Sequence, residues 1–316
     1  MPVPSEFSSA DSRLSAPIDL GRVRTLFRDP ARVAESGFLR REVAARMHER
    51  LQVIKLEPTV VLDAGCGEGA DLVTLQKRFA QATVLGLDAS FGMLSEAQAV
   101  QKDGLSSVHR MLQQWLPAGM GIGRDSMAGL MCGDFARLPL AGNSVDMVWS
   151  NLAVHWHPQP DAVFGEWRRV LSQDGLLMFS CFGPDTFREL RTAFAESGAQ
   201  HVLPFVDMHD FGDMLVNAGF STPVMDMETL TITYGSVEKL IADVRAIGGN
   251  PLDTRPRGLF GRDAWQRVVE RLERQRRDVD GKIPLTVEVA YGHAFRPAPR
   301  ATASGESIIR FDRPRK

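Results

Sequence analysis

Three glycines and one aspartate have the spacing of a nucleotide-binding turn. Gly65, Gly67 and Gly69 follow a short apolar run, and Asp88 ends a second such run 19 residues beyond Gly69. Because glycine has no Cβ atom, this spacing allows a tight turn whose backbone N–H groups and following helix approach a ligand closely. A carboxylate at the end of the second run can accept hydrogen bonds from both ribose hydroxyls of an adenosine. The glycines alone also fit a dinucleotide-binding turn or a turn without a ligand.

Later parts of the chain narrow this choice. The ordered series VLDAGCGEG, GLDAS, GDFARLPL, SVDMVWSNLAVHW and RRVLSQDGLLMFS, over about residues 58–182, resembles the class I S-adenosylmethionine-dependent methyltransferases. The resemblance implies that the glycine turn holds the methionine part of the cofactor, Asp88 the ribose and Asp134 the adenine amino group. The cofactor-binding residues expected on this basis are Asp63, Gly65, Gly67, Gly69, Asp88, Ala89, Asp134, Phe135, Ser150 and Asn151.

The residues that would act on the acceptor are fewer. Methyl transfer depends mainly on positioning, and an anionic acceptor needs no general base, whereas an amine or hydroxyl acceptor normally does. The sequence holds no strong base constellation, which favours an anionic acceptor such as a carboxylate. His155 and His157 flank Trp156 after the fourth predicted strand. Without a third ligand they indicate packing at a strand end rather than a metal site, although His155 could face the acceptor.

Arginines beyond the fifth predicted strand offer a partner for a carboxylate. Arg188 and Arg191 share one face of a predicted helix, and Arg188 could clamp a carboxylate through two hydrogen bonds. A solvated helix face is the alternative. Residues 251–282 carry nine basic and six acidic side chains. This excess suits an acidic partner such as an acyl carrier protein, but a surface helix with Arg–Glu pairs accounts for it equally well.

A closer resemblance covers roughly residues 20–297. The stretches GPDTFRELRTAF, PFVDMHDFGDMLVNAGF, TLTITYGSVEKLIADVRAIGGN and GKIPLTVEVAYGHA are similar to the malonyl-[acyl-carrier protein] O-methyltransferases of biotin biosynthesis. The resemblance implies S-adenosylmethionine as cofactor and methylation of the free carboxylate of malonyl-acyl carrier protein, or of malonyl-CoA. His155 and Arg188, singled out above by their positions after strands, are the residues expected to act on the acceptor. Two departures are the absence of any tyrosine before Tyr234 and a longer stretch at 101–127.

Two alternatives remain open. Much of GPDTFRELR and PFVDMHDFGDMLVNAGF is shared with the methyltransferase-like assembly factors of respiratory complex I, one of which hydroxylates an arginine. A scaffold that binds the cofactor and transfers nothing is the other alternative. Failure to methylate any acceptor while the cofactor is bound would favour the scaffold.

The elements that must position these residues alternate between strand and helix. Short apolar runs at 59–63, 83–88, 128–132, 144–150 and 175–181 are separated by helical patterns, and further strands are expected at 225–234 and 285–295. This alternation predicts an α/β fold with a doubly wound, mostly parallel, Rossmann-like sheet of seven strands. N-terminal helices precede the sheet, and a helical insertion precedes its last strand. The expected organisation is a flexible tail at 1–22, one domain at 23–300 with helical lid elements at about 23–51 and 236–281, and a tail at 301–316.

Composition excludes several classes of protein. The 316 residues are 44% hydrophobic and 24% charged, with a net charge of −2, so no basic field attracts nucleic acid. Three widely spaced cysteines form neither a disulfide framework nor a zinc site. No apolar run approaches the roughly 18 residues of a membrane span. We therefore expect a cytoplasmic protein with no nucleic-acid partner, no membrane insertion and no metal.

Overall fold

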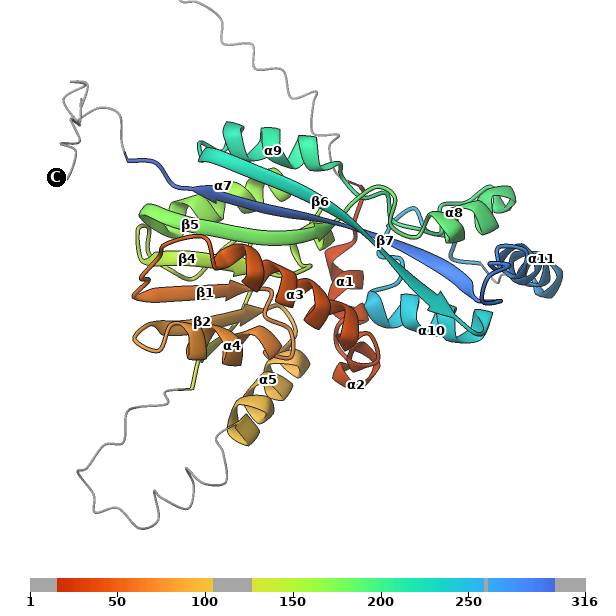
Figure 1. The fold of residues 1–316 in the computed structure, drawn as a ribbon, viewed down its shortest axis with the longest axis horizontal. Coiled ribbons are helices and arrows are strands. Elements are labelled where there is room, and N and C mark those ends of the chain that lie inside the picture. Colours follow the sequence, from red (N-terminus) through yellow and green to blue (C-terminus); the bar gives the residue numbers. More distant parts are fainter. Residues whose placement is uncertain (1–15, 105–126, 259–260, 299–316) are drawn as a thin grey trace, which may run out of the picture.

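A computed structural model describes residues 16–104, 127–258 and 261–298. The strands of these residues form one seven-stranded sheet in the order β3-β2-β1-β4-β5-β7-β6 (Figure 1). Their bounds are β1 Val60–Ala64, β2 Thr83–Asp88, β3 Gly129–Cys132, β4 Val145–Ser150, β5 Leu171–Phe182, β6 Ser221–Tyr234 and β7 Ile283–Phe295. The five neighbouring strands β3, β2, β1, β4 and β5 pair in parallel. β7 is antiparallel to both of its neighbours, β5 and β6. The predicted doubly wound, mostly parallel sheet is confirmed.

Helices precede, separate and follow the strands. They are α1 Leu20–Leu26, α2 Pro30–Ala34, α3 Gly37–Leu51, α4 Ala70–Arg78, α5 Phe91–Gly104, α7 Pro160–Val170, α8 Arg188–Phe194, α9 Met208–Asn217, α10 Val237–Ile247 and α11 Arg262–Glu273. Short 3₁₀ helices occupy Val154–Trp156 and Ala195–Ser197. In the described ranges, no helix has the length and apolar character needed to cross a membrane. Most of the 101–127 stretch and the tail at 301–316 lie outside the described residues.

The N-terminal boundary differs from the expected one. Helix α1 begins at Leu20, inside the segment expected to be a tail, because the Asp19 carboxylate accepts the N–H of Arg22 at 3.0 Å and caps the helix. Just before it, Ile18 forms a β-bridge with Leu252. This bridge joins the start of the domain to the loop after α10.

Hydrophobic residues alternate between the two faces of the sheet. On β1, Val61 belongs to the core beneath α3 and α4, whereas the next residue, Leu62, belongs to the core beneath α7 and α9. On β4, Trp149 and Val148 divide between the two cores in the same way. Successive side chains of a strand point to opposite faces, so both faces of the central strands are covered by helices.

The order of the strands determines where a ligand can bind. β1 and β4 are neighbours at the centre of the sheet. The chain leads from β1 to β2 on one side of this pair and from β4 to β5 on the other side. In open α/β sheets, ligands bind in the crevice beside such a reversal, at the carboxyl ends of the strands. Helices α1, α2 and α10 lie near one another beside this part of the sheet (Figure 1), and α2 contacts both α5 and α10.

Candidate cofactor and acceptor site

The turn after β1 depends on glycine at two close approaches. Gly65 and Gly69 have φ angles of +85° and +77°, a region that favours glycine. A Cβ atom on Gly65 would lie 2.6 Å from Cβ of Ala153, and one on Gly69 would lie 2.7 Å from Cβ of Ala97. The N–H of Gly65 donates to the carbonyl of Leu87 at 2.8 Å. The turn is thus held against β2, with helix α4 beginning directly after it.

Asp88 connects the glycine turn to the end of β2. Its Oδ2 accepts the N–H of Gly67 at 3.0 Å, and its Oδ1 accepts the N–H of Ser90 at 2.8 Å. Burial raises the pKa of the Asp88 carboxyl, and these two hydrogen bonds oppose the rise. Each carboxylate oxygen can accept two hydrogen bonds. One position on each oxygen therefore remains for a ligand hydroxyl. Ala89, the next residue, is exposed.

Asp63 is the most buried carboxyl group at the site. It is 1% exposed, and its Oδ2 has no hydrogen-bond partner among the described residues. Burial, followed by the negative charges of Asp71, Asp88 and Glu68, raises its pKa well above the usual value. A buried acceptor without a partner costs free energy. Asp63 therefore suits a ligand that brings a positively charged donor.

The end of β4 is held by polar contacts to the elements around the glycine turn. The Ser150 hydroxyl donates to the carbonyl of Ala64 at 2.8 Å. The Asn151 amide donates to Oδ2 of Asp71 at 3.1 Å and to the carbonyl of Arg40 at 3.0 Å. Ser150 thus joins β4 to β1, while Asn151 joins β4 to α3 and α4.

Asp134 and Phe135 follow β3 on the other side of the turn. The Asp134 Oδ1 accepts the N–H of Ala136 at 2.9 Å. The Phe135 ring approaches Gly65, since its Cδ1 lies 3.8 Å from the position of a Cβ on that glycine, and it lies 5.9 Å from the His157 ring. The Phe135 ring therefore lies beside the glycine turn, and Asp134 directly precedes it in the chain.

A cavity of about 40 Å³ lies over the turn, and we call it the glycine-turn cavity. Its lining residues are Arg40, Arg41, Asp63, Gly65, Cys66, Gly67, Glu68, Ala70, Asp71 and Asn151. Four of them were predicted from the sequence: Asp63, Gly65, Gly67 and Asn151. The other predicted cofactor residues do not line this cavity. Arg40 contributes to the lining from α3, and its Nη2 lies 2.7 Å from Oε1 of Glu68.

A second, smaller cavity adjoins the first. This aromatic pocket, of about 20 Å³, is lined by Phe27, Ser36, Leu39, Arg40, Leu152, Trp156, Phe182 and Ile247. Arg40 lines both cavities and is the charged residue of the aromatic pocket. The Phe27 ring lies 5.4 Å from the Trp156 ring, edge to face, and the Phe27 carbonyl accepts the Ser90 hydroxyl at 3.0 Å. The segment between α1 and α2 therefore packs against Trp156 and the loop that follows β2.

The two residues expected to act on the acceptor lie in different surroundings. His155 is buried, with its ring 4.6 Å from that of Phe182 and 4.7 Å from that of Trp156, and burial lowers its pKa to about 3. Its Nδ1 accepts the N–H of Phe182 at 3.4 Å. Arg188 lies on α8 with its side chain 57% exposed and forms an ion pair with Asp185 at 3.6 Å. Arg188 is not among the described residues that line either cavity.

The basic stretch at 251–282 divides into paired and unpaired arginines. Four of its arginines form ion pairs with nearby acids: Arg271 with Glu196, Arg274 with Glu270, Arg276 with Glu273 and Arg277 with Asp280. The pairs of Arg274 and Arg276 match the interpretation as a surface helix with Arg–Glu pairs. Arg271 instead pairs with a residue 75 positions away, and Arg277 pairs with an aspartate. Arg255, in contrast, donates to the carbonyl of Leu252 at 2.8 Å and lines a separate hollow.

Arg40 is a site residue that the sequence analysis did not predict. The buried positions Leu39, Val43 and Met47 follow helical spacing and place Arg40 next to the face that packs on the sheet. This helical spacing could be read from the sequence. It does not show, however, against which strand ends the helix packs. The contact with Glu68, 28 positions further along the chain, depends on that packing.

Known proteins are similar to the chain at several levels. A family profile described as "Methyltransferase domain" matches residues 62–179. A malonyl-[acyl-carrier protein] O-methyltransferase of Gallionella capsiferriformans is 47% identical over 87% of this chain and 90% of its own length. The protein of that name from Laribacter hongkongensis is 46% identical over 93% and 96%. Among solved structures, a putative methyltransferase of Bacillus halodurans covers 81% of this chain and 99% of its own, with a TM-score of 0.54 and 15% identity, which shows a shared fold.

Proposed function

This chain belongs to the malonyl-[acyl-carrier protein] O-methyltransferase family, and from this premise we propose that it methylates the free carboxylate of a malonyl group on acyl carrier protein. The methyl donor is S-adenosylmethionine. The role in biotin biosynthesis, expected from the resemblance, is part of the same proposal. Methylation converts a charged carboxylate into a neutral ester.

The position of Arg40 is the observation that carries the proposal for the acceptor. Its guanidinium lies where the glycine-turn cavity meets the aromatic pocket, so a carboxylate bound to it is next to the cofactor turn. Glu68 now accepts two of its N–H groups, at 2.7 and 3.2 Å, and the Ser36 hydroxyl and the Val33 carbonyl accept two more, each at 3.1 Å. A carboxylate that binds through two hydrogen bonds therefore has to replace Glu68. A guanidinium has five donors in a planar fork that matches a carboxylate. Arg40 thus replaces Arg188 as the proposed residue that binds the acceptor.

The residues around the glycine turn fit S-adenosylmethionine. The unpartnered Oδ2 of Asp63 suits its ammonium group, and the free acceptor positions of Asp88 suit its ribose hydroxyls. Phe135 and Asp134 would flank and bind the adenine. When bound, the cofactor would supply a methyl group on a sulfonium, which would pass to an acceptor oxygen by in-line attack while the C–S bond breaks and the sulfur leaves as a neutral thioether. The acidic groups around Asp63 favour a cationic ligand over a neutral one.

The aromatic pocket, whose volume of about 20 Å³ is room for about one water molecule, would have to open to admit the malonyl group. The transfer itself needs no general base. A carboxylate is already a nucleophile, so no proton has to be removed before transfer. The burial that keeps His155 neutral agrees with this, since the ring then neither repels nor attracts the acceptor charge. Phe27, Trp156 and Phe182 exclude water around the reacting oxygen. Once esterified, the acceptor loses its attraction to Arg40, which favours release of the product.

The helical elements predicted as a lid contribute to this pocket. Phe27 and Arg40 come from the 23–51 segment, and Ile247 comes from the 236–281 segment. We include in the proposal that these two segments cover the acceptor during methyl transfer. Such a cover would keep water from the carboxylate and hold it beside the glycine turn.

Mass spectrometry of the carrier protein tests the proposal. The purified enzyme is incubated with S-adenosylmethionine and malonyl-acyl carrier protein, and the carrier should gain the mass of one methylene group. The acetyl form, which lacks a free carboxylate, is the control and should gain nothing. No gain on the malonyl form while calorimetry shows bound cofactor would contradict the proposal and favour a non-catalytic scaffold or an assembly factor.

A further inference from the structure

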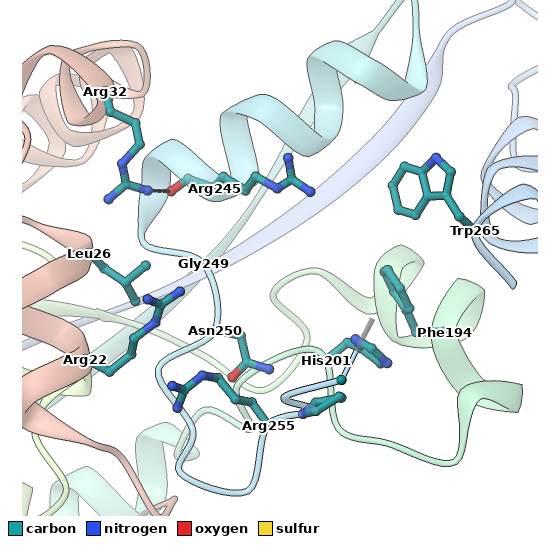
Figure 2. Close-up of a pocket in the computed structure, with 12 residues that line it drawn as sticks. Arg22, Leu26, Arg32, Phe194, His201, Arg245, Gly249, Asn250, Arg255 and Trp265 are labelled. Carbon is teal, nitrogen blue, oxygen red and sulfur yellow. Dashed lines mark hydrogen bonds between the residues drawn. The ribbon is translucent and has the colours of Figure 1, made fainter. Parts of the chain in front are cut away.

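A hollow of about 500 Å³ lies apart from the cofactor turn, and four arginines line it (Figure 2). Arg22 comes from α1, Arg32 from α2, Arg245 from α10 and Arg255 from the loop after α10. The other lining residues are Leu26, Phe194, His201, Gly249, Asn250, Pro256, Gly258 and Trp265. No described residue of this lining is an aspartate or a glutamate. We call this site the arginine hollow.

The four arginines have no acidic partners within the described residues. Arg32 donates to the carbonyl of Arg245 at 2.6 Å, and Arg255 donates to the carbonyl of Leu252. The Nε of Arg22 is buried and lacks a hydrogen-bond partner in the described part of the chain. Arginines elsewhere in the described structure do form ion pairs; Arg50, for example, pairs with Asp226 at 2.5 Å. Four like charges around one hollow are stabilised when an anion occupies it.

The arginine hollow adjoins the aromatic pocket through a thin wall. Leu26 lines the hollow, and its neighbour Phe27 lines the pocket. At the end of α10, Ile247 lines the pocket, and Gly249, two positions later, lines the hollow. Between them, Gly248 packs so closely that a Cβ atom would lie 2.4 Å from Trp156 and 3.2 Å from the Phe27 ring. The two sites are therefore two parts of one region, with the aromatic pocket nearer the glycine turn.

We propose that the arginine hollow binds the phosphate of the phosphopantetheine arm through which a carrier protein presents its acyl group. This inference rests on the proposed function. For the thioester end of an arm held there to reach the aromatic pocket and Arg40, the arm has to pass the wall formed by Gly248, Trp156 and Phe27. Guanidinium groups bind phosphate through paired hydrogen bonds. Leu26, Phe194, Pro256 and Trp265 provide apolar contacts for the carbon chain of the arm.

Acceptors that differ only in phosphate test the proposal. The Arg22→Gln/Arg255→Gln double variant is compared with wild type on malonyl-acyl carrier protein, on free malonyl-phosphopantetheine and on malonyl-pantetheine. We expect KM for the two phosphate-bearing acceptors to rise about tenfold or more, the factor that corresponds to loss of one charge-assisted hydrogen bond. The value of kcat and the KM for malonyl-pantetheine should not change. Arg24→Gln is the matched control, since Arg24 lies on the same helix, is exposed and does not line the hollow.

Direct binding separates this proposal from the proposed function. Calorimetry with free phosphopantetheine, and with pantetheine as the phosphate-free control, does not depend on turnover. Binding of phosphopantetheine to wild type, with loss in the double variant, supports the site even if no acceptor is methylated. Equal effects on malonyl-phosphopantetheine and malonyl-pantetheine would overturn it. So would an effect on the carrier protein alone, which would mean that the arginines contact acidic side chains of the carrier.

Discussion

The backbone N–H of Gly67 and the Oδ2 of Asp88 lie 3.0 Å apart, and this hydrogen bond joins the turn after β1 to the end of β2. The same carboxylate orders the next loop through the N–H of Ser90. Asp88 therefore shapes the cofactor turn before any ligand binds. Its remaining acceptor positions then lie beside the turn that it orders.

Replacement of Asp88 should weaken cofactor binding strongly. Asp88→Ala removes a charged acceptor and leaves the N–H of Gly67 without its partner, which together should cost about 1.5–3 kcal/mol or more of binding free energy. We expect the dissociation constant of S-adenosylmethionine, measured by calorimetry, to rise at least about tenfold. Glu57→Ala, at an exposed position outside the site, is the control. Unchanged affinity in Asp88→Ala would remove the assignment to the ribose.

Cofactor binding should release protons through Asp63. Its pKa is raised well above the usual value in the free protein, and a bound ammonium group stabilises the ionised form and lowers that pKa. Binding is then accompanied by proton release, and affinity rises with pH until Asp63 is ionised in the free protein. Calorimetry in buffers of different ionisation enthalpy measures the released protons. In Asp63→Asn, the number of protons released on cofactor binding should fall by the amount that Asp63 contributes. If the number released is unchanged, another group is responsible.

The central sheet could be predicted because each strand has a local signal. The run Thr83–Asp88 is apolar, short and followed by a break in the pattern, and β2 has the same bounds. Helix α9 was not predicted, although Asp207 caps it through the N–H of His209 at 2.8 Å. Its buried residues Phe211, Met214 and Leu215 repeat at helical spacing. The signal was present but spans just ten residues in an otherwise irregular stretch.

The site was predictable to the extent that its residues follow strands. The glycine turn and Asp88 come directly after β1 and at the end of β2, so strand positions bring them together. The acceptor side depends instead on how helices from the two ends of the chain meet. Arg32 and Arg245 are 213 positions apart, and their contact depends on the packing of α2 against α10. No local pattern in the sequence encodes that proximity.

Loss of the Arg40 charge should weaken acceptor binding rather than cofactor binding. Arg40→Gln removes the cation shared by the two cavities, so KM for malonyl-acyl carrier protein should rise by about 10- to 100-fold. Arg40→Lys keeps the charge but not the planar fork and should fall between wild type and Arg40→Gln. Affinity for S-adenosylmethionine, measured by calorimetry, should fall less than affinity for the acceptor, since Asp63 and Asp88 stay in place although the contact between Arg40 and Glu68 is lost. An unchanged KM in Arg40→Gln would exclude the proposed contact.

Raised and lowered pKa values give opposite dependences of stability on pH. Asp63 keeps its proton in the folded state above the pH at which it ionises in the unfolded chain, so its contribution to stability falls as pH rises through that window. His155 is neutral when folded down to about pH 3 but takes up a proton near pH 6.5 when unfolded. Its contribution falls as pH decreases from 6.5 towards 3. Chemical denaturation across this range should show that His155→Phe reduces the loss of stability in acid.

The same variant tests whether His155 transfers a proton. A general base at this position would contribute about 10²–10⁴-fold to the rate. Phenylalanine keeps an aromatic ring among Phe182, Phe205 and Trp156 and removes the ring nitrogens. Because a carboxylate needs no base and His155 is neutral above about pH 3, we expect kcat for malonyl-acyl carrier protein to fall less than about tenfold. A loss of about a hundredfold or more, in a variant that still folds and binds cofactor, would instead assign proton transfer to His155.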